Sequence, residues 1–381
     1  MPAMRFGGTL TMPAPVSPRM LRGQREFQAI QRAWSLEWGF GYPQLEEVEV
    51  RAPTAPPPTG RPGRIGTFFS GGVDSWSTVL EHPEITDLIF VRGFDLMPDD
   101  DRHVSLVDQV EDRLRAAAAE LELPLHVVET NLRELSDPLL RWDAYFGAGL
   151  VAATLFMAPL FERFLLATDS DYEVQQALGV SRLATQLWST EHLEIVEDGG
   201  RYSRLERLRR IASHPIVRRT LRVCWENPGG SYNCGRCRKC LMTMISLEAL
   251  GMRQGIETFP ERLDLFAVAD IEITHPVNLT LWEDVLDAVR AAGRADLEPA
   301  VEVVVMGGKE RLGLGPEYRR RRGAGPAPLR DGGMGTPGSN RSQTAGDSEK
   351  LLAAVLASRS WRLTAPLRTM GSRLRRMRRQ R

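Results

Sequence analysis

Cysteine is scarce in this sequence, with four residues among 381, and all four lie between positions 224 and 240. Disulfide scaffolds spread many cysteines through short chains, so this count excludes that class. Long apolar runs are missing too. The longest stretch without a charged residue, 144–161, is rich in Gly and Ala and contains Pro159. A membrane span needs about 20 apolar residues, so we predict a helix buried against a sheet rather than a span.

Lysine is also nearly absent, with three lysines against 46 arginines. Residues 1–11 lack the charged start and apolar core of a secretory signal, so we expect a cytoplasmic protein. The net charge is zero, yet residues 311–381 carry 17 basic and 4 acidic side chains, while the first 310 residues carry 32 and 45. The chain therefore combines an acidic body with a basic tail.

Short apolar runs alternate with helical patterns after a Pro-rich stretch at 51–64. We predict strands over 65–69, 87–94, 125–128 and 164–167, with helices starting at Asp74 and covering 107–121. Strands separated by helices predict an α/β fold, with a parallel sheet covered by helices on both faces. Outside this region we predict a strand from Phe6 onward, helices over 21–38 and 279–292, and a strand over 300–306.

The most informative motif is Ser70-Gly71-Gly72-Val73-Asp74-Ser75, which follows a predicted strand and opens a predicted helix. Two glycines allow a tight turn that brings backbone N–H groups against an anion. The helix N-terminus adds positive dipole, and both serine hydroxyls can donate to phosphate oxygens. Asp74 beside a polyanion indicates a bridging Mg²⁺. A glycine turn that merely begins a helix is the structural alternative.

This motif resembles the SGGxDS signature of the PP-loop ATP pyrophosphatases, in the adenine nucleotide alpha hydrolase-like (HUP) superfamily. The resemblance implies that ATP is split between its α and β phosphates, with the loop holding the departing pyrophosphate. It implies roles for Asp74 and Ser75 in catalysis, and a nucleotide site that extends from Phe69 through Val73 to Ser75.

Two further strand ends belong to the same expected site. Gly93 and Asp95 follow the second predicted strand, where relatives contact adenine and ribose, and Asp169 follows the fourth. Ligands of open α/β sheets collect at the carboxyl ends of strands. Helix caps and turns are the ordinary alternative for these residues.

The cysteines Cys224, Cys234, Cys237 and Cys240 have the spacing C-x9-C-x2-C-x2-C, with Gly235 in the turn. Four thiolates around one centre suit a structural Zn²⁺. An iron–sulfur cluster also uses cysteines at this spacing, and some tRNA-thiolating PP-loop enzymes carry one. The order of loop, acid-ended strand and late cysteines resembles the 7-cyano-7-deazaguanine synthase branch over about 66–253, whose cysteines hold zinc.

Polar residues between the sheet and the cysteines form a third group of candidates. Glu191 lies in the run Trp188-Ser189-Thr190-Glu191, and Arg204 in Ser203-Arg204-Leu205-Glu206-Arg207. Such residues could orient a carboxylate and bind the AMP phosphate, or form a cap and a solvated helix face. Lys239, inside the cysteine block, is expected to face solvent.

With four thiols on a metal, none remains to carry a persulfide, and no cysteine follows Met1 to act as a glutaminase nucleophile. We therefore expect an AMP-forming ligase that joins a small-molecule acid to ammonia or an amine. A tRNA thiolase with an iron–sulfur cluster and a non-catalytic nucleotide-binding module are the alternatives.

We expect five segments along the chain. They are an N-terminal strand and helix with the linker (1–60), the ATP-binding domain (61–222), the four-cysteine knuckle (223–256), a helix and strand extension (257–310) and a disordered basic tail (311–381). The arginine-dense tail could lie on the inner face of an anionic membrane, bind nucleic acid without sequence preference, or stay solvated.

Overall fold

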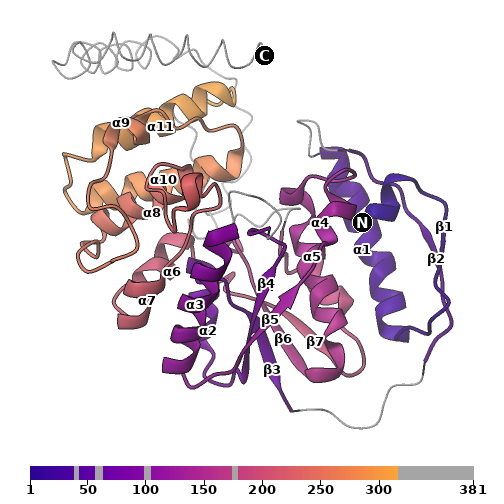
Figure 1. The fold of residues 1–381 in the computed structure, drawn as a ribbon. Coiled ribbons are helices and arrows are strands. Elements are labelled where there is room, and N and C mark those ends of the chain that lie inside the picture. The colour runs from indigo at the N-terminus through magenta and orange to yellow at the C-terminus, as the bar shows by residue number, and fades with distance from the viewer. Residues whose placement is uncertain (38–42, 56–62, 98–103, 174–178, 316–381) are drawn as a thin grey trace, which may run out of the picture. The chain divides into compact units, whose positions relative to one another are not determined.

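The computed structural model describes residues 1–37, 43–55, 63–97, 104–173 and 179–315 (Figure 1). Most of the predicted basic tail, from residue 316 onward, and the central part of the Pro-rich linker lie outside the described residues. The disorder of the tail and its contacts with a membrane or nucleic acid therefore stay predictions.

Five parallel strands form the central sheet, in the order β5-β4-β3-β6-β7. This confirms the predicted α/β class and parallel sheet. The order reverses between β3 and β6, so the carboxyl ends of these two strands border the crevice where open α/β sheets bind ligands. The strand bounds are β3 Ile65–Phe68, β4 Asp87–Arg92, β5 Leu125–Glu129, β6 Arg163–Ala167 and β7 Glu194–Asp198.

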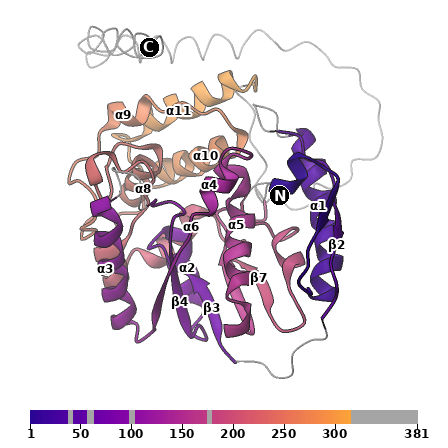
Figure 2. The same cartoon turned by 45° about the vertical axis from the view of Figure 1, so that its right-hand side comes forward.

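Helices cover both faces of this sheet, as Figures 1 and 2 show. The alternating side chains of β4 explain the two layers. Leu88 and Phe90 pack into a core shared with α2 (Val73–Glu81) and α3 (Val104–Glu120). Ile89 and Val91 point to the opposite face and pack into a second core. A strand buried on both faces has apolar residues at successive positions, and the uninterrupted apolar run 88–91 is why β4 was recognisable from its sequence.

The second core is completed by α5 (Trp142–Phe156), which follows the short helix α4 (Leu132–Ser136). Helix α5 and the turn η2 (Ala158–Leu160) account for most of the long uncharged stretch, so the prediction of a helix packed against the sheet is confirmed. Among the described residues, none of the helices combines the length and the apolar character that crossing a membrane requires.

Strand β7 was not predicted. Its sequence, Glu194 to Asp198, contains three acidic residues, a composition that disfavours strands. In the structure Glu197 is only 4% exposed. Burial raises the pKa of this carboxyl to about 7. Packing at the edge of the sheet, next to β6, therefore overrides the local preference of these residues.

The N-terminal part adds a small parallel pair of strands and a long helix. The predicted strand after Phe6 and helix over 21–38 correspond to β1 and α1, and Phe27 of α1 packs edge-on against Trp188 of the turn η3, with ring centroids 5.0 Å apart. Val16 bridges to Thr54, so the start of the Pro-rich stretch belongs to this unit. The bounds are η1 Pro2–Arg5, β1 Thr9–Thr11, α1 Pro18–Glu37, β2 Glu49–Arg51 and η3 Thr185–Trp188.

The part after β7 is helical throughout, apart from turns. The predicted helix over 279–292 is confirmed as α10, but the predicted strand over 300–306 is wrong, because these residues belong to α11. The valine-rich run favours a strand locally, yet Val301, Val304 and Val305 recur at helical spacing and are buried together. The bounds are α6 Arg204–Ile211, α7 Pro215–Thr220, η4 Pro228–Gly230, α8 Arg238–Ala249, α9 Leu265–Ala269, α10 Pro276–Ala291 and α11 Glu298–Arg311.

The turn after β4 yields a test of the fold. Gly93 has a φ of +99°, and a Cβ atom there would lie 1.7 Å from the carbonyl oxygen of Thr130. We expect Gly93→Ala to lower the free energy of unfolding by more than about 2 kcal/mol. The control Gly251→Ala also has a positive φ, of +66°, but open space around it, so it should cost about 1 kcal/mol. Equal losses in urea unfolding would contradict this account of the turn.

Candidate functional site

The glycine turn after β3 has the backbone shape that the sequence predicts. Gly71 has a φ of +74°, and a Cβ atom there would lie 3.1 Å from Leu114 and 3.2 Å from the carbonyl oxygen of Thr220. Gly72 is extended and caps the helix that starts at Val73. The turn therefore ends at a helix N-terminus on the carboxyl edge of the sheet, next to the reversal of strand order.

The side chains of this loop divide into two groups. Phe69 and Val73 are buried in the core, and the ring of Phe69 packs edge-on against Trp76, so both residues hold the turn in place. Ser70 is exposed, and its hydroxyl lies 3.5 Å from that of Ser75, which donates to the carbonyl oxygen of Gly72 at 3.1 Å. The Ser70 hydroxyl is thus on the open side of the turn, whereas Ser75 is buried at the start of α2.

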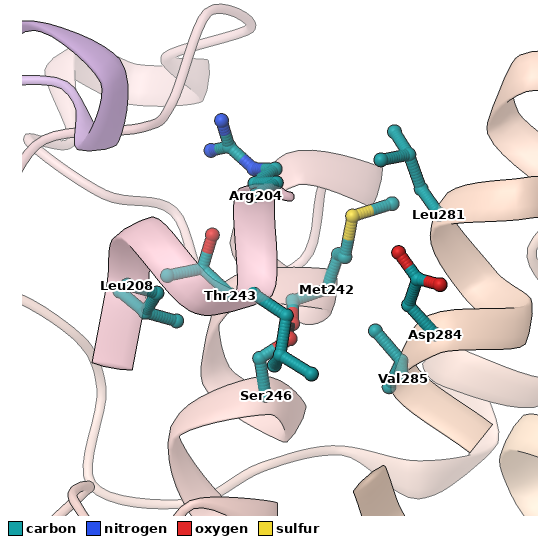
Figure 3. Close-up of a pocket in the computed structure, with 9 residues that line it drawn as sticks. Arg204, Leu208, Met242, Thr243, Ser246, Leu281, Asp284 and Val285 are labelled. Carbon is teal, nitrogen blue, oxygen red and sulfur yellow. Dashed lines mark hydrogen bonds between the residues drawn. The ribbon is translucent and has the colours of Figure 1, made fainter. Parts of the chain in front are cut away.

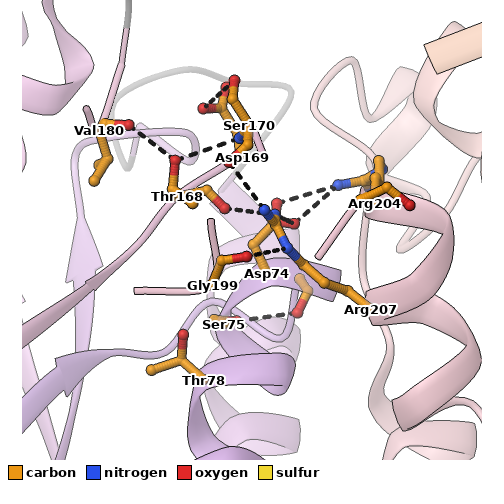
Figure 4. A network of polar contacts seen from close by, with 12 residues as sticks. Asp74, Ser75, Thr78, Thr168, Asp169, Ser170, Val180, Gly199, Arg204 and Arg207 are labelled. Atoms are coloured by element: carbon orange, nitrogen blue, oxygen red, sulfur yellow. Dashed lines mark hydrogen bonds and ion pairs between the residues drawn. The ribbon is translucent and has the colours of Figure 1, made fainter. Parts of the chain in front are cut away.

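Asp74 is held by two arginines from the start of α6 (Figure 4). Its carboxylate accepts hydrogen bonds from Arg207 at 2.8 Å and from Arg204 at 3.1 Å. Burial alone would raise the pKa of Asp74, but the charges of Arg204 and Arg207 outweigh it and lower the pKa below its ordinary value. Asp74 is therefore a carboxylate at neutral pH.

Arg207 was not among the predicted site residues. Its side chain is 1% exposed and also donates to the carbonyl oxygens of Thr168 at 2.6 Å and Ser170 at 3.1 Å. It thus joins the loop to the carboxyl end of β6. A signal was present in the sequence, because the Ser203-x-x-Glu206 cap sets the start of α6 and puts Arg204 and Arg207 on one face.

Asp169, at the end of β6, lies close enough to Asp74 for the two charges to interact. Burial, and then the negative charge of Asp74, raise the pKa of Asp169. The Asp169 side chain is nevertheless exposed to water. The structure therefore brings Asp74, Asp169 and Arg204 near one another at the carboxyl edge of the sheet.

Asp95 lies on the other side of the loop, after the Gly93 turn. It is exposed, and its carboxylate accepts a hydrogen bond from the indole of Trp142 at 3.4 Å. Its charge also acts on Arg222, a buried residue whose backbone N–H donates to the carbonyl oxygen of Gly71 at 2.8 Å. Asp95 thus faces the loop from the β4 side.

Glu191 does not join this group. It precedes β7, at the amino edge of the sheet, whereas the loop lies at the carboxyl edge. Its carboxylate accepts a hydrogen bond at 2.9 Å from the backbone N–H of Arg19, in the first turn of α1. The position of Glu191 indicates a cap for α1 rather than a contact with a ligand at the loop.

The four cysteines form a compact cluster whose sulfur atoms all lie within 4.8 Å of one another. The Cys224–Cys237 and Cys234–Cys240 sulfur pairs are 3.8 and 3.9 Å apart. Four thiolates at 2.3 Å from one tetrahedral Zn²⁺ would be separated by about 3.8 Å. A cluster of several iron atoms would hold its cysteines farther apart. The geometry therefore fits a single metal ion such as zinc.

The surroundings of the cysteines suit metal ligation as well. Backbone N–H groups of Asn227 and Cys237 point at the sulfurs of Cys224 and Cys234, at 3.3 and 3.2 Å. Hydrogen bonds from neighbouring thiols lower the pKa of Cys224 and raise that of Cys237 to about 12, because close thiolates repel one another. A divalent cation removes this repulsion and keeps all four sulfurs ionised.

The backbone just before the first cysteine also supports the glycine turn. The backbone N–H of Arg222 donates to the carbonyl oxygen of Gly71. The next two residues, Val223 and Cys224, both donate their N–H groups to the side-chain oxygen of Asn233. The Asn233 amide in turn donates to the carbonyl oxygens of Leu221 and Thr258. Sequence reasoning missed this connection, because it depends on a contact between distant parts of the chain.

Comparison with known proteins gives no relative: no family model, no curated protein and no solved structure matches this chain.

Metal analysis tests the cysteine cluster. We expect the purified protein to contain about one zinc per chain and no visible absorption band. Cys237→Ser should lose most of the metal and lower the melting temperature by more than about 5 °C, because metal binding contributes to folding. Iron in the protein, with a brown colour, would contradict a single-ion zinc site.

The buried Glu197 predicts a pH dependence of stability. Its folded pKa of about 7 lies above the ordinary 4.5, so the unfolded chain releases this proton first as the pH rises. The contribution of Glu197 to the free energy of unfolding should therefore fall between about pH 4.5 and 7 and then level off. In denaturant titrations, the difference between wild type and Glu197→Gln should follow this curve. A constant difference across this range would contradict the raised pKa.

Proposed function

We propose that this protein is an ATP-dependent adenylating enzyme of the PP-loop type, with the HUP fold, that activates a carboxylate as its AMP ester and transfers it to ammonia or an amine. One observation carries the proposal: the Ser70–Ser75 loop joins a central parallel strand to a helix N-terminus, at the point where the strand order reverses. This is the place and the backbone geometry that bind a polyphosphate.

The loop residues have distinct tasks in this proposal. The backbone N–H groups of the turn and the α2 N-terminus bind the outer two phosphates, and the hydroxyls of Ser70 and Ser75 donate to their oxygens. These donors stabilise the charge that develops on pyrophosphate as it leaves. Gly93 and Asp95, after β4, border the side of the loop where the adenosine would lie.

The acidic side chains fit a Mg²⁺ ion. A carboxylate has about four acceptor sites, so Asp74 keeps capacity for a metal beside its two arginines. The neighbouring Asp169, whose pKa is raised by burial and by Asp74, would lose that repulsion with a divalent cation between them. Bound Mg²⁺ would neutralise phosphate charge during the transfer.

The reaction then has two steps. A carboxylate oxygen of the substrate attacks the α-phosphorus of ATP. The bond between the α-phosphorus and the oxygen that bridges to the β-phosphate breaks. Pyrophosphate departs, and the acyl-adenylate remains. The amine attacks the acyl carbon, releases AMP and forms an amide. Arg204 lies beside Asp74, where it can bind the AMP phosphate once ATP competes with Asp74 for its guanidinium.

The cysteine geometry bears on the main alternative, a tRNA thiolase of the same superfamily. Such an enzyme needs an iron–sulfur cluster or a free cysteine to carry sulfur. All four cysteines of the chain lie in one cluster, with sulfur spacings that suit a single ion. This supports the ligase over the thiolase. A non-catalytic nucleotide-binding module remains the second alternative.

Pyrophosphate release tests the proposal. We expect Mg²⁺, ATP and a pool of candidate acids to give pyrophosphate and an adenylated product, detected by mass spectrometry. Asp74→Asn should lower the rate at least about 100-fold, because it weakens both the metal site and the arginine contacts. Asp112→Asn, an exposed change on α3, is the matched control and should keep the wild-type rate.

A second loop variant distinguishes a loss of catalysis from a folding defect. Asp74→Asn leaves Arg207 buried without its carboxylate, whereas Ser75→Ala removes one hydroxyl whose protein contacts are local. We expect Ser75→Ala to fold normally and to lose about tenfold in rate. ATP binding without pyrophosphate release under any substrate would favour the binding module, and absence of ATP binding would overturn the proposal.

A further inference from the structure

The zinc knuckle places a cation beside the phosphate loop. Lys239 is the second residue of α8, between the ligands Cys237 and Cys240, so its backbone is fixed once the metal is bound. The side chain is exposed. Within the described part of the chain, no carboxylate forms an ion pair with it. The expectation that Lys239 is exposed to solvent is thus correct.

Electrostatics locate the Lys239 ammonium near both acidic residues of the site. After the larger effects of burial and of the two arginines, the positive charge of Lys239 also contributes to the lowered pKa of Asp74. It opposes the rise in the pKa of Asp169 that burial and Asp74 cause. The ammonium is therefore near enough to both carboxylates for its charge to act on them, although these residues come from α2 and from the end of β6.

The packing of α6 against α8 gives a second indication of where Lys239 lies. Arg204, which binds Asp74, lines a small pocket together with Met242 and Thr243 of α8 (Figure 3). The Thr243 hydroxyl donates to the carbonyl oxygen of Lys239 at 2.8 Å. Residues four apart lie on one face of a helix, so Lys239 continues the α8 face that meets Arg204, whose guanidinium binds Asp74.

Lys239 differs from Arg204 and Arg207 in the partners of its positive charge. Arg204 and Arg207 are both engaged by Asp74. Lys239, which has no ion-pair partner among the described residues, brings a cation towards the part of the molecule that holds the N-terminus of α2. An ammonium is a compact positive charge, so in this position it is suited to bind a negatively charged phosphate oxygen.

We propose that Lys239 is a nucleotide-binding residue supplied by the zinc knuckle, and that its ammonium binds a phosphate oxygen of the ATP held by the Ser70–Ser75 loop. This inference rests on the proposed function and extends it, since the metal would then position a residue of the nucleotide site as well as stabilise the fold.

Titration calorimetry with MgATP, inorganic pyrophosphate and adenosine tests this inference. We expect Lys239→Gln to weaken binding of MgATP and of pyrophosphate about tenfold, and to leave the response to adenosine unchanged. The matched control is Arg236→Ala, which removes an exposed positive charge from the same knuckle, between Cys234 and Cys237. It should bind MgATP like wild type, and both variants should keep one zinc per chain.

The outcomes separate this inference from the function on which it rests. Wild-type affinity for MgATP in Lys239→Gln, with zinc intact, would overturn the role of Lys239 and leave the proposed enzyme standing. Equal weakening in Lys239→Gln and Arg236→Ala would also overturn it, because a general charge effect would then explain the loss. A wild-type protein that binds neither MgATP nor pyrophosphate would overturn both proposals.

Discussion

The buried pair of Arg207 and Asp74 is the interaction on which the geometry of the site depends. A guanidinium that is 1% exposed is costly to bury unless its donors are satisfied, and here they reach Asp74 and the carbonyl oxygens of Thr168, Ser170 and Gly199. These partners belong to the start of α2 and to the ends of β6 and β7. One side chain therefore fixes three carboxyl-edge elements relative to one another, which no set of local turns could do.

Local information was sufficient for much of the fold. The β3–turn–α2 unit was predictable because Gly71 and Gly72 are required by backbone shape, and the cysteine cluster because four ligands fall within 17 residues. Strand β4 was predictable since its four central residues are all apolar. In each of these cases the residues that cause the structure are neighbours in the sequence.

The remaining features depend on tertiary contacts. Strand β7 carries acids that only sheet packing tolerates, and α11 has a valine-rich sequence that becomes helical because one face packs in a core with α10. Arg207 and Arg222 owe their importance to partners in the loop, and Glu191 was expected at the site but lies at the opposite edge of the sheet. Sequence patterns identify chemistry at one position, but they do not show which strand end a distant side chain reaches.

The contact between the backbone of Arg222 and Gly71 joins residues that are 151 positions apart. Contacts of this separation form late in folding, because a long loop must close before they stabilise anything. A ribosome delivers the glycine turn well before the segment that supports it. A nascent or truncated chain that stops ahead of residue 222 thus carries the motif in its sequence, but lacks the neighbour that gives the turn its working shape.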